Sequence, residues 1–454
     1  MSAGSKGLQG LSAQLRDQLI RQVLERRLRR AAETPPAAGE AGAGERAEDA
    51  APVPEAHWRF SLQPGYQQLR IMREGGARLG LADPYFHVHE GVAGNVTRIG
   101  GRELVNFSSY NYLGLNGDRQ VVEAARRAME RYGTSVSASR LVSGERPVHR
   151  ELEAALAAAY GVEDCVAFVS GHATNVSTIG HLLGPKDLVV HDALIHNSAL
   201  QGMLLSGAQR RAFAHNDWRS LEEILRRERR AFERVLVMIE GVYSMDGDFP
   251  ELPRFVEVKR RHRAWLMVDE AHSFGVMGPR GLGLREHFGL AGGEVDIWMG
   301  TLSKTLAGCG GFIAGERALV ENLRFFAPGF LYSVGMSPPL AAASCAALGK
   351  MLAEPERVRR LQARGALFLR LAQEAGVDTG TSSGCAVIPA ITGSSVKAAR
   401  LAAALYERGV NVQPILYPAV PEKSARLRFF VSCLHTEGQI RDAVAALAEE
   451  LKAL

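Results

Sequence analysis

The sequence predicts an α/β fold with a large, mostly parallel β-sheet and a smaller second domain of helices and shorter strands. Short, continuously apolar runs such as "CVAFVS" (165–170) and "RVLVMIE" (234–240) alternate with longer amphipathic stretches from about residue 100 onward. Strands that are apolar along their whole length are typical of parallel sheets that helices cover on both faces. The chain has 454 residues, of which 46% are hydrophobic, so it can build more than one layer of structure.

The first 57 residues differ in composition from the rest. Within residues 1–30, leucines and a valine recur at helical spacing and arginines occupy the other side, which predicts an amphipathic helix. Residues 31–57 are rich in Ala, Gly, Pro and Glu, a composition typical of a flexible linker. The helix is either an unattached tail or a docking element for a partner.

The remaining chain divides into an N-terminal segment (58–110), a large domain (111–335) and a small C-terminal domain (336–454). A helix is expected over 146–161, with Gly161 as its C-terminal stop. Further large-domain strands are expected at "DLVVHD" (187–192), "AWLMVDE" (264–270) and "VDIWMGT" (295–301), and small-domain strands at "CAVIPAI" (385–391) and "RLRFFVS" (426–432).

The bulk composition argues against two classes of function. The net charge is +5, but no basic patch is interleaved with aromatic residues, so nucleic-acid binding is not expected. No apolar run approaches the roughly 18 residues that span a bilayer. The five cysteines show no CxxC spacing, which favours a reducing compartment and hence a cytoplasmic protein.

Polar residues stand out where the predicted strands end. Lys304 follows one strand, Asp269 and His272 end another, and His196 follows a third. "SGHATN" (170–175) joins a strand to a helix, whose N-terminus would suit a phosphate. Ligands of such sheets bind at the carboxyl ends of the strands. An amine, a carboxylate, a flat imidazole and a phosphate cradle together match pyridoxal 5′-phosphate, because a lysine can bind its aldehyde and an aspartate its pyridine nitrogen.

Six stretches carry a resemblance to a known family. From about residue 85 to the C-terminus, the sequence resembles the α-oxoamine synthases, which are fold-type I pyridoxal-phosphate enzymes with a seven-stranded sheet. The resemblance rests on "FSSYNYLGL", "SGHATN", "EGVYSMDGD", "VDEAHSFGVMGPRGLG", "GTLSKTLAGCGGF" and "LRFFVSCLHT". It implies a homodimer that condenses a small L-amino acid with an acyl thioester, giving an α-amino ketone, CO₂ and a free thiol.

The resemblance also implies roles for individual residues. Lys304 would hold the cofactor aldehyde as a Schiff base and move the substrate's α-proton, and His196 would stack on the ring and help at the acyl carbonyl. Asp269 would pair with the pyridine nitrogen and His272 with the ring hydroxyl. Further cofactor contacts would come from Gly171 and His172 through backbone amides, Thr301, Ser244 and, across a subunit interface, Ser333. Substrate contacts would come from Arg428, through the amino-acid carboxylate, from Asn111 and from Tyr110, which either lines the pocket or packs.

Several alternatives stay open. The amino acid is expected to be serine, alanine or glycine, in that order, and the thioester either acyl-CoA or an acyl-carrier protein. The arginine-rich helix within 1–30 would suit docking of an acidic carrier. An aminotransferase, lyase or racemase would share Asp269 and Lys304 but need not share the "SYNYLG" stretch. A non-enzymatic scaffold is opposed by the intact set of Lys304, Asp269 and His272.

Overall fold

The computed structural model describes residues 53–78, 80–81 and 83–454. The helix predicted within 1–30, and the predicted linker as far as residue 52, lie outside the described residues. The chain divides after Asp83 into two compact units. The longest described element of the first unit is one helix, which Pro64 begins because its fixed φ suits a first helical turn. The described elements of this unit are η1 (Glu55–His57), η2 (Phe60–Leu62) and α2 (Pro64–Arg78).

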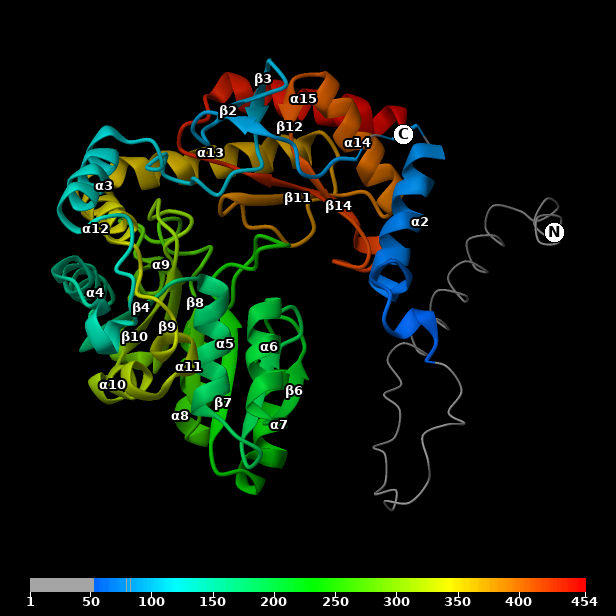
Figure 1. Ribbon diagram of the computed structural model, residues 1–454. Coiled ribbons are helices and arrows are strands. Elements are labelled where there is room, and N and C mark those ends of the chain that lie inside the picture. Colours follow the sequence, from blue (N-terminus) through cyan, green and yellow to red (C-terminus); the bar gives the residue numbers. More distant parts are fainter. Residues whose placement is uncertain (1–52, 79, 82) are drawn as a thin grey trace. The chain divides into compact units, whose positions relative to one another are not determined.

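A seven-stranded sheet forms the centre of the second unit, as predicted (Figure 1). Its strand order is β4-β10-β9-β8-β7-β5-β6, and only β10 runs antiparallel to its neighbours. The strands are β4 (Asp164–Phe168), β5 (Leu188–Asp192), β6 (Gln209–Phe213), β7 (Val235–Glu240), β8 (Trp265–Asp269), β9 (Ile297–Thr301) and β10 (Gly311–Gly315). The mostly parallel α/β fold is therefore confirmed.

Helices cover both faces of this sheet and bury alternate side chains of its strands. In β7, Leu236 and Met238 belong to one apolar core, whereas Val237 and Ile239 belong to a second and larger one. Alternation between two buried faces explains why the strand is apolar along its whole length. The helices between residues 119 and 331 are α3 (Arg119–Tyr132), which packs on the later helix α12 (Pro338–Ala353), α4 (Pro147–Tyr160), α5 (Gly171–Leu182), α6 (Asn197–Ser206), α7 (Trp218–Glu228), α8 (Leu252–His262), α9 (Gly283–His287), α10 (Arg317–Phe326) and α11 (Pro328–Leu331).

Gly161 ends α4 in the left-handed conformation, with φ of 64°, as expected for a helix stop. Four short helical turns complete this part of the chain. They are η3 (Arg140–Gly144), η4 (Arg229–Ala231), η5 (Gly292–Glu294) and, farther on, η6 (Glu422–Ser424).

Two small sheets and four C-terminal helices complete the second unit. The pairing of β3 with β12 was not expected, because it joins the N-terminal segment to a strand about 300 residues later, with Val105 opposite Val410. The predicted boundaries at residues 111 and 336 stay predictions. The sheets are β1 (His89–Glu90), β2 (Val96–Ile99), β3 (Arg102–Asn106), β12 (Val410–Asn411) and, separately, β11 (Val387–Ile391), β14 (Arg426–Phe430), β13 (Gln413–Ile415). The helices are α12 (Pro338–Ala353), α13 (Pro355–Glu374), α14 (Ser395–Glu407) and α15 (Glu437–Ala453).

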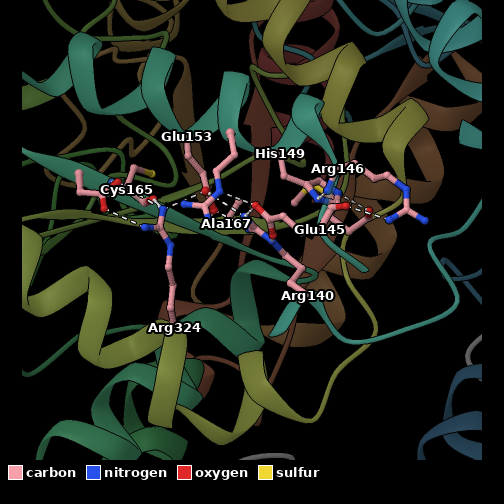
Figure 2. A network of polar contacts seen from close by, with 11 residues as sticks. Arg140, Glu145, Arg146, His149, Glu153, Cys165, Ala167 and Arg324 are labelled. Carbon is pink, nitrogen blue, oxygen red and sulfur yellow. Dashed lines mark hydrogen bonds and ion pairs between the residues drawn. The ribbon is translucent and has the colours of Figure 1, made fainter. Parts of the chain in front are cut away.

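A buried network of charges joins α4 to its surroundings (Figure 2). Glu153 of α4 accepts hydrogen bonds from Arg140 at 2.5 and 3.0 Å, from Arg324 of α10 at 2.9 Å and from the Ala167 N–H at 2.8 Å. Arg140 also donates to both carboxylate oxygens of Glu145, at 2.6 and 2.8 Å. Each charged group of this network therefore faces an opposite charge.

None of the helices in the described ranges has the length and apolar character that a membrane crossing requires. All five cysteines are free thiols, and Cys165 and Cys433 are buried.

Candidate active site

Lys304 lies at the tip of a tight loop between β9 and β10. Leu302 and Leu306 are fully buried and anchor the loop, and the hydroxyl of Thr305 donates to the Phe274 carbonyl at 3.0 Å. Ala307 adopts a positive φ of 53°, which turns the chain back toward β10. The loop therefore holds the lysine backbone in place and leaves its side chain half-buried.

The amine of Lys304 has no hydrogen bond or ion pair with any described residue and lies 5.6 Å from the centre of the Tyr110 ring. Burial lowers the pKa of Lys304 to about 8. Asp269 and Glu240 favour the charged form, whereas Arg428 opposes it. An amine in this environment is partly unprotonated near neutral pH, as a nucleophile or a proton-transfer base requires.

A chain of hydrogen bonds links Asp269, at the end of β8, to His196. The Asp269 carboxylate accepts from the Asn175 side-chain amide at 2.8 Å, and the same amide donates to Oγ of Ser198 at 2.9 Å. Ser198 lies 2.8 Å from Nδ1 of His196, and its backbone N–H also donates to that nitrogen. Nδ1 therefore acts as an acceptor, and burial lowers the pKa of His196, so its ring is a neutral imidazole.

His272 lies within an aromatic group. Its Nδ1 is 2.7 Å from the hydroxyl of Tyr112. Its ring stacks on Phe430, with the ring centres 6.2 Å apart, and meets Tyr110 edge-on, with the ring centres 5.9 Å apart. Burial, followed by the charges of Lys304 and Arg428, holds the pKa of His272 well below its usual value. In the tautomer in which the Tyr112 hydroxyl donates to Nδ1, the neutral ring carries its proton on Nε2, where it can donate to a ligand.

The start of α5 forms a narrow cradle against β9. A side chain at Gly171 would place its Cβ 3.0 Å from Oγ1 of Thr301, so the helix can approach this closely only with glycine there. Ser170 caps the helix by accepting from Ala173. The backbone N–H groups of Gly171 and His172 donate to no described residue, and exposed N–H groups at a helix start suit a phosphate.

Arg428 and Ser244 meet on the other side of the site. Arg428 of β14 donates to the carbonyl of Ser244 at 3.0 Å and contacts the sulfur of Met245 at 3.4 Å. Its guanidinium also lies 4.6 Å from the Phe430 ring centre. The buried Nε of Arg428 has no hydrogen-bond partner, and the guanidinium has no ion pair among the described residues, so a carboxylate would complete it.

A cavity of about 350 Å³ opens beside Lys304, and its wall includes Tyr110, Asn111 and Ser303. A larger cavity, of about 770 Å³, lies at the opposite ends of the strands, beside Trp265 and Ile297, and none of the predicted site residues lines it. Of the predicted site residues, Lys304, Tyr110 and Asn111 line the smaller cavity.

Several groups in this site have no hydrogen-bond partner among the described residues: the Lys304 amine, the N–H groups that begin α5, Nε of Arg428 and the buried Oδ1 of Asn175. Together with the Asp269 carboxylate and the neutral rings of His196 and His272, they fit pyridoxal phosphate, which offers an aldehyde, a phosphate, a pyridine nitrogen and a flat ring.

Residues 102–447 match the family model of aminotransferases of class I and II. The chain belongs to this family. It is 41% identical over 351 residues to the 8-amino-7-oxononanoate synthase of Cellvibrio japonicus, across 77% of this chain and 87% of that protein. It is 36% identical over 371 residues to the serine palmitoyltransferase of Bacteroides thetaiotaomicron, across 82% and 93%.

A solved serine palmitoyltransferase with bound pyridoxal phosphate has a TM-score of 0.81 and 29% identity, covering 86% of this chain and 98% of that one. The predicted family, fold type and cofactor are thereby confirmed. The chain is an α-oxoamine synthase, a pyridoxal-phosphate-dependent acyltransferase that condenses an amino acid with an acyl thioester and releases CO₂.

The structure brings most of the predicted residues of this α-oxoamine synthase to one place. Asn111 lines the cavity beside Lys304, but its side-chain amide is already engaged, because it donates to the Ala93 carbonyl and accepts from the Asn116 N–H. The His172 side chain is exposed, in keeping with a backbone role only. Ser333 lies in the loop after α11 and makes no hydrogen bond with the other site residues. The functional roles of all these residues stay predictions.

Sequence reasoning missed Asn175, Ser198 and Tyr112. Each lies in or next to a stretch that contains predicted site residues. Asn175 ends "SGHATN", Ser198 follows His196 by two residues, and Tyr112 follows Asn111. Helical spacing could have predicted Asn175. It lies four residues, about one helical turn, after Gly171, so both residues share the same face of α5.

Proposed function

We propose that this α-oxoamine synthase uses serine, alanine or glycine as its amino acid and either acyl-CoA or an acyl-carrier protein as its thioester. The observation that carries the proposal is the unpaired Lys304 amine, with its lowered pKa, beside the hydrogen-bonded chain from Asp269 through Asn175 and Ser198 to His196.

Lys304 has two tasks in this proposal. It binds the cofactor aldehyde, and it then accepts the proton from the α-carbon of the amino acid and returns a proton at the end. When bound, pyridoxal phosphate draws electrons from the α-carbon toward its protonated ring. A positioned base contributes about 10²–10⁴-fold to such a proton transfer.

Asp269 and His196 hold the reacting groups in place. The Asn175 amide and the Ala271 N–H, at 2.8 and 3.0 Å, fix the Asp269 carboxylate, which would keep the pyridine nitrogen protonated. The neutral ring of His196 would stack on the cofactor and offer its Nε2–H to the acyl carbonyl. Charge placed in advance around the reacting atoms supplies a large part of the rate in such sites.

Arg428 would hold the carboxylate of the amino acid and so select which bond of the α-carbon reacts. A carbon–carbon bond then forms between the α-carbon and the acyl carbonyl, and the carbon–sulfur bond breaks to release the thiol. The carboxylate leaves as CO₂, and protonation of the α-carbon completes the α-amino ketone.

The names of the relatives narrow the choice of amino acid. The name serine palmitoyltransferase gives serine as the amino acid of that relative. In 8-amino-7-oxononanoate, the amino group lies beside a terminal methyl group, which alanine would supply. Neither name points to glycine, so serine and alanine are the first two to test.

The proposal includes a homodimer, with Ser333 contacting the cofactor phosphate across the subunit interface, and a cytoplasmic location, which the five free thiols support. It also includes docking of an acidic acyl-carrier protein on the arginine-rich N-terminal segment.

The test is a visible absorption spectrum of the purified protein with pyridoxal phosphate, recorded while serine, alanine and glycine are added in turn. A band that Lys304→Ala lacks, and that shifts with one amino acid, identifies both the cofactor lysine and the amino acid. Acyl-CoA and acyl-carrier thioesters are then compared with that amino acid.

Release of both CO₂ and free thiol separates this reaction from those of an aminotransferase, a lyase or a racemase. A spectrum that Lys304→Ala leaves unchanged would overturn the proposed role of Lys304.

A further inference from the structure

His215 lies outside the predicted site and binds two carboxylates at once. It follows β6 and precedes α7. Its Nδ1 lies 2.8 Å from Oδ1 of Asp192, and its Nε2 lies 3.0 Å from Oδ2 of Asp248. The His215 side chain is 22% exposed, compared with 0% for Asp192 and 10% for Asp248. Because both ring nitrogens face carboxylates, both must carry a proton, and the ring is an imidazolium.

The two carboxylates belong to the two loops that carry predicted cofactor residues. Asp192 ends β5, four residues before His196, and also accepts from the N–H groups of Leu194 and Asn216 at 2.8 Å each. Asp248 lies four residues after Ser244 in the loop that follows β7. His215 therefore joins these two loops through a single ring.

The loop after β7 is also tied to the C-terminal region. Thr381 donates to Oδ2 of Asp248 at 2.7 Å. Gly247, with φ of +70°, packs so closely that a Cβ there would lie 1.9 Å from the Val387 carbonyl. On its other side, the same loop meets Arg428 at Ser244. A shift of Asp248 would therefore be transmitted to both Ser244 and Arg428.

The charge of His215 is well supported by its surroundings. Burial alone would lower the pKa of His215, but hydrogen bonds and charges of Asp192 and Asp248 raise it to about 10. The His215 and Tyr243 rings meet edge to face, with their centres 4.5 Å apart, and Nδ2 of Asn216 lies 3.4 Å from Nε2 of His215. A neutral substitute could satisfy only one of the two carboxylates as a donor and would leave the other buried with one partner fewer.

We propose that His215 is a positioning residue for the cofactor site: as an imidazolium it sets the distance between the His196 loop and the Ser244 loop. This inference rests on the proposed roles of His196, Ser244 and Arg428. A purely structural histidine would affect stability alone, whereas a positioning residue also changes how the cofactor and the amino acid are held.

The test compares His215→Gln with a matched control, Lys259→Met. Lys259 makes a half-buried ion pair with Asp296, at 2.9 Å to both oxygens, which ties α8 to the opposite end of the large sheet from Lys304. Both variants lose one ion-pairing side chain, and only His215 joins loops of the site. Cofactor is removed from each protein, and the dissociation constant for pyridoxal phosphate is then measured by absorbance titration, together with Tm and the visible circular dichroism of the bound cofactor.

The expected result is a 10–100-fold weaker affinity for pyridoxal phosphate in His215→Gln, roughly the loss found when a residue that orients a metal ligand is removed. Its visible circular dichroism should change, and KM for the amino acid should rise more than kcat falls. Lys259→Met should lower Tm but keep the dissociation constant within about twofold of the parent protein.

Equal dissociation constants and identical circular dichroism in the two variants would overturn the inference and leave the proposed function standing. Failure of the parent protein to bind pyridoxal phosphate would overturn the proposed function itself. If His215→Gln does not fold, Asp248→Asn takes its place, since it keeps the shape and an acceptor oxygen. Asp248→Asn is then compared with Lys259→Met in the same way, and its affinity for pyridoxal phosphate is expected to fall at least fivefold.

Discussion

Two charged regions of this molecule treat their charges in opposite ways. In the network around Glu153, Arg140, Arg324 and Glu145 each face an opposite charge, and the side chains of Arg140 and Glu153 are only 4% and 2% exposed (Figure 2). Around Lys304, by contrast, neither the lysine amine nor the Arg428 guanidinium has an ion pair among the described residues. Each region leaves one buried arginine Nε without a partner, that of Arg324 and that of Arg428, so the missing ion pairs are what distinguish the second region.

The difference separates a structural network from a binding site. Buried polar groups are normally satisfied, because an unsatisfied one costs about 1–3 kcal/mol of stability. A lysine and an arginine that lack ion pairs near the same carboxylate and imidazoles therefore indicate a ligand that completes them. The paired network should govern stability, and the unpaired site should govern activity.

Replacing Lys304 with alanine should break the site and leave the fold intact. Turnover should fall by about 10³-fold or more, since both the cofactor attachment and the proton transfer depend on this amine. The cofactor-free variant should be no less stable than the parent protein below pH 8, because no ion pair is lost and burial disfavours the charged amine that is removed. Thiol release and urea unfolding measure the two quantities. Substantial turnover in this variant would contradict the assignment.

Replacing Glu153 with glutamine should have the reverse effect. An amide NH₂ would face the donors of Arg140 and Arg324, so we expect a loss of about 3–5 kcal/mol in the free energy of unfolding. The kcat of the folded fraction should stay near that of the parent.

Glu145→Gln is the matched control for this change, because Glu145 is 33% exposed and water can replace part of its bonding. Its loss should be nearer 1 kcal/mol, measured by urea unfolding. Equal losses in the two variants would mean that burial does not distinguish the two carboxylates.

Replacing Arg428 with lysine should raise KM for the amino acid by about 10–100-fold with a smaller change in kcat, since a lysine cannot offer a carboxylate two parallel donors. Arg426, two residues earlier on the same face of β14, is the matched control because Asp246 already holds it at 2.6 Å. Because Arg426 also donates to the Met245 carbonyl in the Ser244 loop, Arg426→Lys should lower Tm and raise KM by less than Arg428→Lys does. Steady-state kinetics measure both, and an unchanged KM in Arg428→Lys would remove Arg428 from the substrate site.

Local pattern predicted the parts of this molecule that depend on neighbours in sequence. The apolar strands, the stop at Gly161 and the residues at the strand ends are examples, because strand burial and parallel order place those ends together. The resemblance then named Lys304, Asp269, His196 and His272 as one group, and the structure brings them together.

Contacts between distant segments could not be predicted in this way. The link from Asn175 to Ser198 depends on how α5 packs against α6, and the pairing of β3 with β12 joins segments about 300 residues apart. In "YNYLG", the sequence favoured Asn111 and Tyr110, whereas Tyr112 is the residue that bonds His272. The direction of each side chain in such a loop depends on its packing, which pattern alone does not reveal.

The smallest expected effect concerns pH, and it distinguishes the unpaired amine from an ordinary one. Since burial lowers the pKa of Lys304 to about 8, the capture of pyridoxal phosphate by the cofactor-free protein should speed up about tenfold per pH unit below pH 8 and level off above it. A solvent-exposed lysine would keep gaining up to about pH 10.4. Stopped-flow absorbance from pH 6 to 10 gives the midpoint.

The free energy of unfolding should also depend on pH through the Lys304 amine, and the direction of this dependence can be derived. Between pH 8 and about 10.4, the unfolded chain binds a proton at this lysine and the folded chain does not, so stability should rise with pH relative to Lys304→Met. His215 works in the opposite direction because its pKa is raised to about 10, and its contribution is lost as the pH rises from about 6.5 to 10. It is common to both proteins, so it cancels in the difference between their urea-unfolding free energies. A capture midpoint near 10, or a flat difference between the two proteins, would show that Lys304 behaves as an exposed lysine.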